Sequence, residues 1–154
     1  MQVELDEGAI IKASDQFWEQ MLAMKLEPTA FPDQFCVAAG HLEASVRFSG
    51  VWDGRIEVRM AEKLAHLATA AMLMQPLETV TEVDTLDATK EIANMIAGVI
   101  KSSLPRPCAM TVPESVVSNK KFCSYARTHN SVVVAFRHES GDLMVCVSEE
   151  HGPR

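Results

Sequence analysis

The chain has 154 residues, of which 47% are apolar and 23% charged, and its formal net charge is −7. These values suit a globular protein that buries a core without disulfides or metals, and they exclude an intrinsically disordered chain. The sequence has no basic face that would neutralise nucleic-acid phosphates or attract an anionic membrane, so we expect neither partner. We predict a single domain over residues 1–154.

The N-terminal and cysteine patterns predict a cytoplasmic protein. The N-terminus is acidic and leads into no apolar run, so we expect no signal peptide. The longest weakly polar run, Leu64–Met74, is too short to span a bilayer. The cysteines are widely spaced in strand-like contexts, which favours buried thiols over disulfides or zinc ligands: Cys36, Cys108, Cys123 and Cys146.

The first half of the chain reads as one helix followed by strands. Apolar residues at helical spacing predict a helix over residues 7–26, which Glu27-Pro28 ends. A short apolar run and two alternating runs predict strands at residues 35–39, 45–49 and 55–60. Asp53-Gly54 lies between the alternating runs and predicts a hairpin turn, because both residues tolerate positive φ.

The second half contains two helices and then strands again. We predict helices over residues 61–74 and 84–104, the second capped by Asp84 and ended by Pro105-Arg106-Pro107. The last third predicts turns at residues 128–130 and 140–142, and strands at residues 108–112, 122–126, 132–136 and 143–147. Strands grouped between helices predict an α+β fold, an antiparallel sheet packed by long helices.

The helix predicted over residues 84–104 has an unusual polar side. Five residues fall on one stripe at alternating spacings of four and three: Asp87, Glu91, Asn94, Gly98 and Lys101. The opposite side is apolar and would fix the helix on a core, through Ile92, Met95, Ile96, Val99 and Ile100. The helix therefore displays an acid and a carboxamide, Glu91 and Asn94, at fixed geometry.

Other chemistries find little support in the sequence. There is no G-x-S-x-G motif, and the cysteines lie in core-like strands rather than beside a candidate base. The five histidines show no metal-binding spacing, and most read as loop or edge residues. No glycine-rich phosphate loop is present.

Two interpretations of the polar stripe remain open from the residues alone: a solvated helix face and a functional face that contacts another molecule. The solvated face is the more common of the two. Against it, Asn94 has poor helix propensity, and Gly98 in mid-helix costs about 1 kcal/mol relative to alanine. That cost is understandable where another molecule approaches the backbone closely.

At these residues the sequence resembles the CheX/CheC family of chemotaxis phosphatases. The resemblance rests on Asp87-x-x-x-Glu91-x-x-Asn94, on the following Met95-Ile96-Ala97-Gly98, and on Pro113-Glu114-Ser115-Val116 nineteen positions after the asparagine. It is closest to the CheX type, which has one Glu-x-x-Asn motif where CheC has two. The first predicted helix repeats the spacing with Asp15 and Glu19, but it has Leu22 in place of asparagine.

The resemblance implies a CheC-like fold and a phosphatase whose substrate is the aspartyl phosphate of a CheY-like receiver domain. Asn94 would then position the attacking water, and Glu91 would pair with the receiver's lysine. Asp87 and Gly98 would contact the partner, which supplies Mg²⁺, so that no cofactor of the chain's own is needed. CheX-type relatives are homodimers that exchange strand structure. A non-catalytic receiver-binding or assembly module on the same fold is the alternative.

Overall fold

The computed structural model describes residues 6–29, 35–124, 127–128 and 130–150. These residues form three α-helices and a short 3-10 helix: α1 (Glu7–Leu22), α2 (Glu62–Leu73), η1 (Leu77–Thr79) and α3 (Glu82–Lys101). They also form ten strands: β1 (Glu27–Pro28), β2 (Phe35–Val37), β3 (Leu42–Gly50), β4 (Gly54–Met60), β5 (Cys108–Met110), β6 (Glu114–Val117), β7 (Phe122–Ser124), β8 (Arg127–Thr128), β9 (Ser131–Arg137) and β10 (Leu143–Glu149). The predicted α+β class is confirmed.

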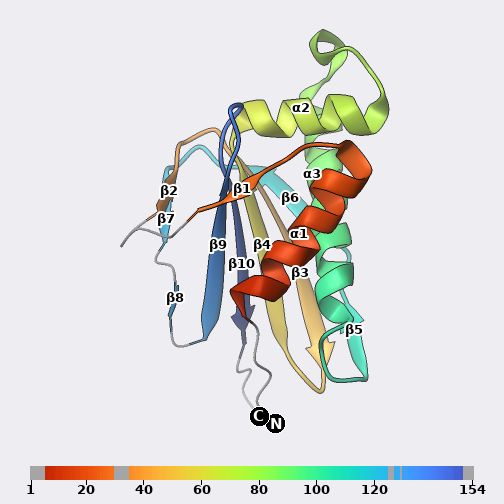
Figure 1. Cartoon of the computed structure of the whole chain (residues 1–154), viewed down its shortest axis with the longest axis vertical. Helices are drawn as coiled ribbons and strands as arrows, with labels where there is room; N and C mark the ends of the chain where they lie inside the picture. The colour runs from red at the N-terminus through yellow and green to blue at the C-terminus, as the bar shows by residue number, and fades with distance from the viewer. Residues whose placement is uncertain (1–5, 30–34, 125–126, 129, 151–154) are drawn as a thin grey trace.

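An antiparallel sheet forms the centre of the molecule, with the strand order β1-β9-β10-β4-β3-β5. β5 and β6 share the outer edge of β3, β5 along Phe48–Gly50 and β6 along Leu42–Ser45. Helices α1 and α3 lie across one face of this sheet, and α2 crosses its upper end (Figure 1). The opposite face is partly covered by a two-stranded ribbon of β2 and β7.

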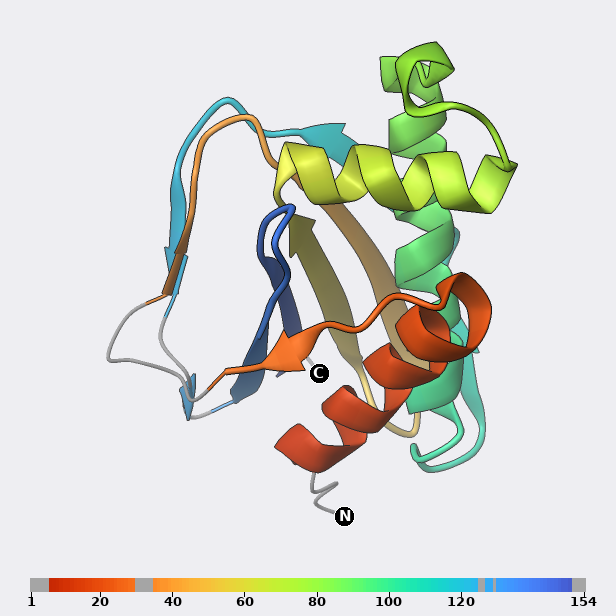
Figure 2. The ribbon, with the colours of Figure 1, turned by 45° about the horizontal axis from the view of Figure 1, so that its top comes forward.

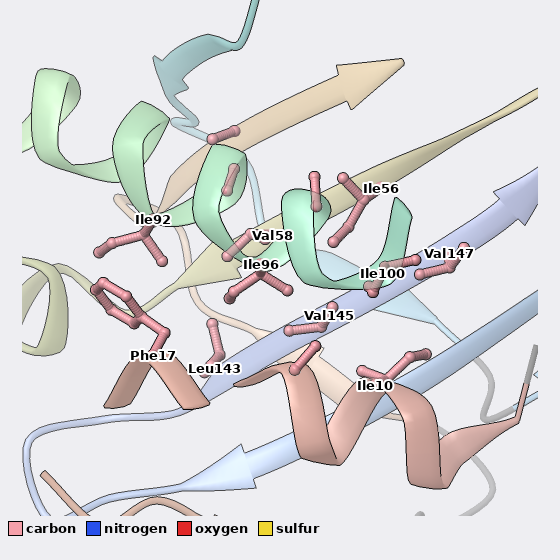
Figure 3. Close-up of a cluster of buried hydrophobic side chains, with 14 of the residues drawn as sticks. Ile10, Phe17, Ile56, Val58, Ile92, Ile96, Ile100, Leu143, Val145 and Val147 are labelled. Carbon is pink, nitrogen blue, oxygen red and sulfur yellow. The ribbon is translucent and has the colours of Figure 1, made fainter. Parts of the chain in front are cut away.

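The main core lies between this sheet and the helices (Figure 3). In β3 and β4 alternate residues are buried, because successive side chains of a strand point to opposite faces. The helices add Ile10 and Phe17 from α1, and Ile92, Ile96 and Ile100 from α3. Burial of such side chains contributes about 1.5–3 kcal/mol each, so α3 is held firmly along its length.

The helices begin and end close to the predicted positions, with three differences. Helix α1 ends at Leu22 rather than at residue 26, because Ala23 takes the left-handed conformation at φ 51° and closes the helix, and Glu27–Pro28 forms β1 instead of the helix stop. The cap of α3 is Thr81 rather than Asp84: the Thr81 hydroxyl accepts a hydrogen bond from the Asp84 N–H, and the Asp84 carboxylate accepts one from the Thr81 N–H. This reciprocal pair places Asp84 inside the first turn. At the other end α3 stops at Lys101, where the Ser102 hydroxyl donates to the Val99 carbonyl and competes with the helix ladder.

The hairpin between β3 and β4 is present, but its geometry differs from the prediction. The residue with positive φ is Gly50, at 140°, whereas Gly54 already belongs to β4. Asp53 supports the connection because its carboxylate accepts a hydrogen bond from the Gly50 N–H. The last two residues of the predicted strand 122–126, and the centre of the turn predicted at 128–130, lie outside the described residues.

The cysteine prediction was wrong for two of the four residues. Cys36 and Cys123 form a disulfide across the β2–β7 ribbon, where they stand directly opposite each other. Because 87 positions separate them, only the pairing of the two strands brings them together. Cys146 fits the prediction better: it is a free thiol whose pKa is raised chiefly by burial, which keeps it protonated and unreactive.

Among the described helices, none is long and apolar enough to cross a membrane.

Candidate functional site

Helix α3 presents the predicted polar stripe at the molecular surface. Ile92, Ile96 and Ile100 are buried on its inner side, and Thr85 and Thr89 are buried with hydroxyls that donate to backbone carbonyls one turn earlier. The outer side carries Asp87, Glu91 and Gly98, all exposed, and Asn94 and Lys101, both half-buried. The predicted division of the helix into a core face and a displayed face is therefore confirmed.

The two residues expected to carry the chemistry have no partners within the described part of the chain. Neither the Glu91 carboxylate nor the Asn94 carboxamide makes a hydrogen bond or ion pair there. Three positions apart on a helix, their Cβ atoms lie about 5–6 Å from each other on the same side. By contrast, the Asp87 carboxylate pairs with Lys90 at 3.4 Å, and the Asp87 side chain is 68% exposed.

Gly98 lies in the open, further along the same stripe. A Cβ atom built on it would meet nothing within 4 Å, so packing inside the chain does not require glycine. Gly98 borders a hollow of about 560 Å³ that Lys101, Arg106 and Pro107 also line. Another molecule has room to approach the helix backbone there, which is what the sequence led us to expect of this position.

The second part of the sequence motif lies beside the helix. The segment that begins at Pro113 continues into β6, whose Ser115 hydroxyl donates a hydrogen bond to the Leu86 carbonyl of α3 at 2.9 Å. This contact joins the first turns of α3 to the edge of the sheet. Ser115 was quoted in the motif, but no spacing in the sequence indicates its bond to a residue 29 positions away.

A second polar cluster lies on the face of the sheet opposite the helices, and its charges are paired within the chain. Arg59 is 7% exposed and contacts the Glu57 carboxylate at 2.8 Å and the Glu43 carboxylate at 3.7 Å. Its guanidinium lies 3.5 Å from the centre of the Phe122 ring. His41 hydrogen-bonds Glu43 at 3.0 Å and is 1% exposed. It lies in the loop just before β3, as expected of most histidines, but its side chain is buried.

The geometry limits the chemistry that α3 can perform alone. In the part of the chain that the structure describes, no three histidine, cysteine or acidic side chains converge in a way that would hold a metal ion. Glu91 is exposed and Asn94 is half-buried on the outer side of α3. A carboxylate can bind a cation and a carboxamide can orient a water by hydrogen bonding, but both act only where another molecule supplies the reacting group.

Comparisons with known proteins place the chain in a family. The family model for the chemotaxis phosphatase CheX matches residues 42–137. Chemotaxis protein CheX from Vibrio vulnificus has a similar structure, with a TM-score of 0.77 at 16% identity, covering 97% of this chain and 99% of that one. Chemotaxis protein CheX from Desulfovibrio desulfuricans has a TM-score of 0.72 at 20% identity, covering 93% of this chain and 97% of that one.

A third solved structure is the complex of CheX with CheY, BeF3 and Mg²⁺ from Borrelia burgdorferi. It gives a TM-score of 0.71 at 14% identity, covering 97% of this chain and 100% of that one. At these identities the likeness shows a shared fold. None of the curated proteins compared with the chain matches it.

Proposed function

The chain belongs to the chemotaxis phosphatase CheX family, and from that premise we propose that it hydrolyses the aspartyl phosphate of a CheY-like response regulator. The observation that carries the proposal is the joint display of Glu91 and Asn94 on a helix fixed by a buried core, with no partners among the described residues. Polar groups that a fold leaves unpaired on a rigid element are available to a second molecule.

Asn94 has the role of positioning the attacking water. Its carboxamide oxygen accepts a hydrogen bond from the water and aligns it with the bond between phosphorus and the aspartyl oxygen. The water oxygen bonds to phosphorus as the aspartyl bond breaks, which yields the free carboxylate and inorganic phosphate. The phosphate keeps both protons of the water, so no strong base is needed.

Glu91 docks the helix. Its carboxylate pairs with the active-site lysine of the receiver, and this ion pair fixes Asn94 one turn further along. Asp87 contacts the rim of the receiver, and Gly98 lets the partner's backbone come close. Mg²⁺ belongs to the receiver, which agrees with the composition of the Borrelia burgdorferi complex, in which CheX, CheY, BeF3 and Mg²⁺ occur together. The chain then needs no cofactor of its own.

The remaining features of the proposal concern the protein as a whole. Residues 1–154 act as a single CheX-like domain. The acidic N-terminus favours the cytoplasm, whereas the Cys36–Cys123 disulfide removes the cysteine pattern as an argument for that location. Two copies form a homodimer through their strand structure, as in CheX-type relatives.

The test is release of phosphate from Mg²⁺-loaded, phosphorylated receiver domains of the same organism, with the parent chain and with Asn94→Ala. We expect the parent to accelerate hydrolysis of at least one receiver, and Asn94→Ala to lose about 10²-fold or more of that acceleration. The free energy of unfolding should not fall, because Asn94 has no partner to lose among the described residues and alanine is the better helix former. An equally active Asn94→Ala variant would show that the water is positioned by another group.

A non-catalytic receiver-binding or assembly module is the second candidate. It is compatible with the same exposed helix, since docking alone needs no water-positioning residue. It predicts tight binding of a BeF3-loaded receiver together with phosphate release at the uncatalysed rate. The presence of both Glu91 and Asn94 favours the phosphatase, because a binding surface has no need of a carboxamide at that place.

A further inference from the structure

Several large apolar side chains near the N-terminal end of α3 are exposed to solvent. Leu73 is 43% exposed, Met74 92%, Leu77 50% and Val83 66%. These four residues, here named the apolar tip, come from the end of α2, from η1 and from the first turn of α3. Figure 2 shows the connection between α2 and α3 extending beyond the rest of the molecule at that end of α3.

Met74 is the least expected member of this group. It ends α2 in the left-handed conformation, at φ 53°, where glycine or asparagine is favoured and other residues cost about 1–2 kcal/mol. Among the described residues, the other non-glycine residue with positive φ is Ala23, whose side chain is small. At Met74 the chain places a long apolar side chain at a strained position and buries almost none of it, which indicates a role outside the fold.

Val83 connects the apolar tip to the Glu91 and Asn94 surface. It lies four positions before Asp87 on α3, so it continues the same exposed stripe. Eleven residues of helix separate Val83 from Asn94, which is about 16 Å at 1.5 Å per residue. One receiver domain covers both, since a protein interface of ordinary size buries about 800 Å² per partner.

The charged residues around the apolar tip are mostly acidic. Residues 73–91 contain five carboxylates and one lysine, a large share of the net charge of −7. Glu78 and Glu82 are exposed beside the tip, as Glu91 is along the helix. At the other end of the stripe Lys101 and Arg106 line the hollow beside Gly98. A partner with a basic rim around an apolar depression would be steered to this surface in one orientation.

We propose that the apolar tip is a second contact of the receiver-docking surface, and that it provides affinity and selectivity among receivers while Glu91 and Asn94 carry the chemistry. The inference rests on the function proposed above. The occupant is the receiver domain itself, which places an apolar depression flanked by lysine or arginine against Met74, Leu77 and Val83. Exposed methionine suits such a contact because its side chain adapts to the shape of a partner.

The experiment uses the full chain with Met74→Asn and Leu77→Ser combined. Asparagine accepts the left-handed conformation, so the cap of α2 is kept while the apolar contact is lost. The matched control is Val112→Ser, since Val112 is 84% exposed and lines a hollow with Ser45 and Arg47 on the helix-free side of the sheet. Binding to Mg²⁺- and BeF3-loaded receivers gives Kd, and phosphate release gives kcat and KM.

We expect the double variant to raise Kd and KM about tenfold or more and to leave kcat within twofold, with Val112→Ser equal to the parent. Unchanged Kd and KM would overturn the inference, even if the parent is an active phosphatase. A parent that binds receivers without hydrolysing their phosphate would contradict the proposed function alone, because the Kd comparison still tests the tip. Sedimentation that shows the double variant losing a dimer instead would assign the tip to a second copy of this chain and would also overturn the inference.

Discussion

Two groups of polar residues lie on opposite sides of the sheet and differ in where their partners are. On the helix-free face, Arg59 lies between the carboxylates of Glu43 and Glu57 and is almost fully buried. On α3, Glu91 and Asn94 have no partner among the described residues. Both groups consist of a charged residue next to residues that can form hydrogen bonds, so their residue types alone do not show which group is structural.

The difference has a physical origin. Burying a charge is costly unless it is paired, so the buried Arg59 guanidinium needs carboxylates of the same chain beside it. The exposed Glu91 carboxylate and the half-buried Asn94 carboxamide need no partner within the chain, because water can satisfy them, and water can be exchanged for a partner. We therefore expect substitutions at Arg59 to act on stability, and substitutions at Glu91 and Asn94 to act on the second molecule.

After Asn94→Ala, the largest effect should come from Glu91→Gln, which removes the docking charge and keeps the shape of the side chain. Losing one partner of a desolvated ion pair costs about 2–5 kcal/mol, so kcat/KM for a phosphorylated receiver should fall 30-fold or more. Steady-state phosphate release measures this loss. The free energy of unfolding should stay within about 0.5 kcal/mol of the parent. A variant that loses stability instead would place Glu91 in the structural group.

Removing the disulfide with Cys36→Ser and Cys123→Ser should lower the free energy of unfolding by about 2–4 kcal/mol, because the cross-link constrains the unfolded chain. Denaturant titration measures the free energy of unfolding, and Cys108→Ser is the control for the loss of a free thiol. The kcat/KM should not change, since the ribbon lies away from α3. If thiol titration of the unreduced, unfolded parent finds all four cysteines free, the disulfide does not form in solution.

Arg59→Met should lower the free energy of unfolding by about 2 kcal/mol, because it leaves two partly buried carboxylates without their cation. The control is Arg55→Met. Arg55 pairs with Glu150 at 2.6 Å but is 38% exposed, so it should lose less than about 1 kcal/mol. Chemical denaturation distinguishes the two. Should Arg59→Met abolish dephosphorylation in a fully stable protein, the helix-free face would belong to the functional surface.

The smallest expected effect is a gain in stability rather than a loss. Gly98→Ala should raise the free energy of unfolding by up to about 1 kcal/mol, because alanine favours the helix and the added methyl meets no neighbour. The same change should weaken receiver binding several-fold if the partner approaches the backbone there. Gly8→Ala on α1 provides the comparison for a helical glycine away from the stripe. Gly98→Ala with unchanged Kd would leave Gly98 with no part in docking.

Much of the candidate site could be predicted because it is local. The stripe from Asp87 to Lys101 and the buried row Ile92, Ile96 and Ile100 follow from helical periodicity within one segment, and the structure confirms both. Alternation along β3 and β4 fixed the core face of those strands in the same way. The family model and the fold agree with the Glu-x-x-Asn resemblance, while the roles of Glu91 and Asn94 stay predictions.

The tertiary structure alone decided what depends on contacts between distant segments. The register of β2 against β7 joins Cys36 to Cys123, and the pairing of β6 with β3 brings Ser115 to α3. The burial of His41 and Arg59 likewise follows from the packing of the ribbon on the sheet. Periodicity in a sequence reports which way a side chain points within its own element. It carries no information on which element lies opposite, because that choice is made by the packing of the whole chain.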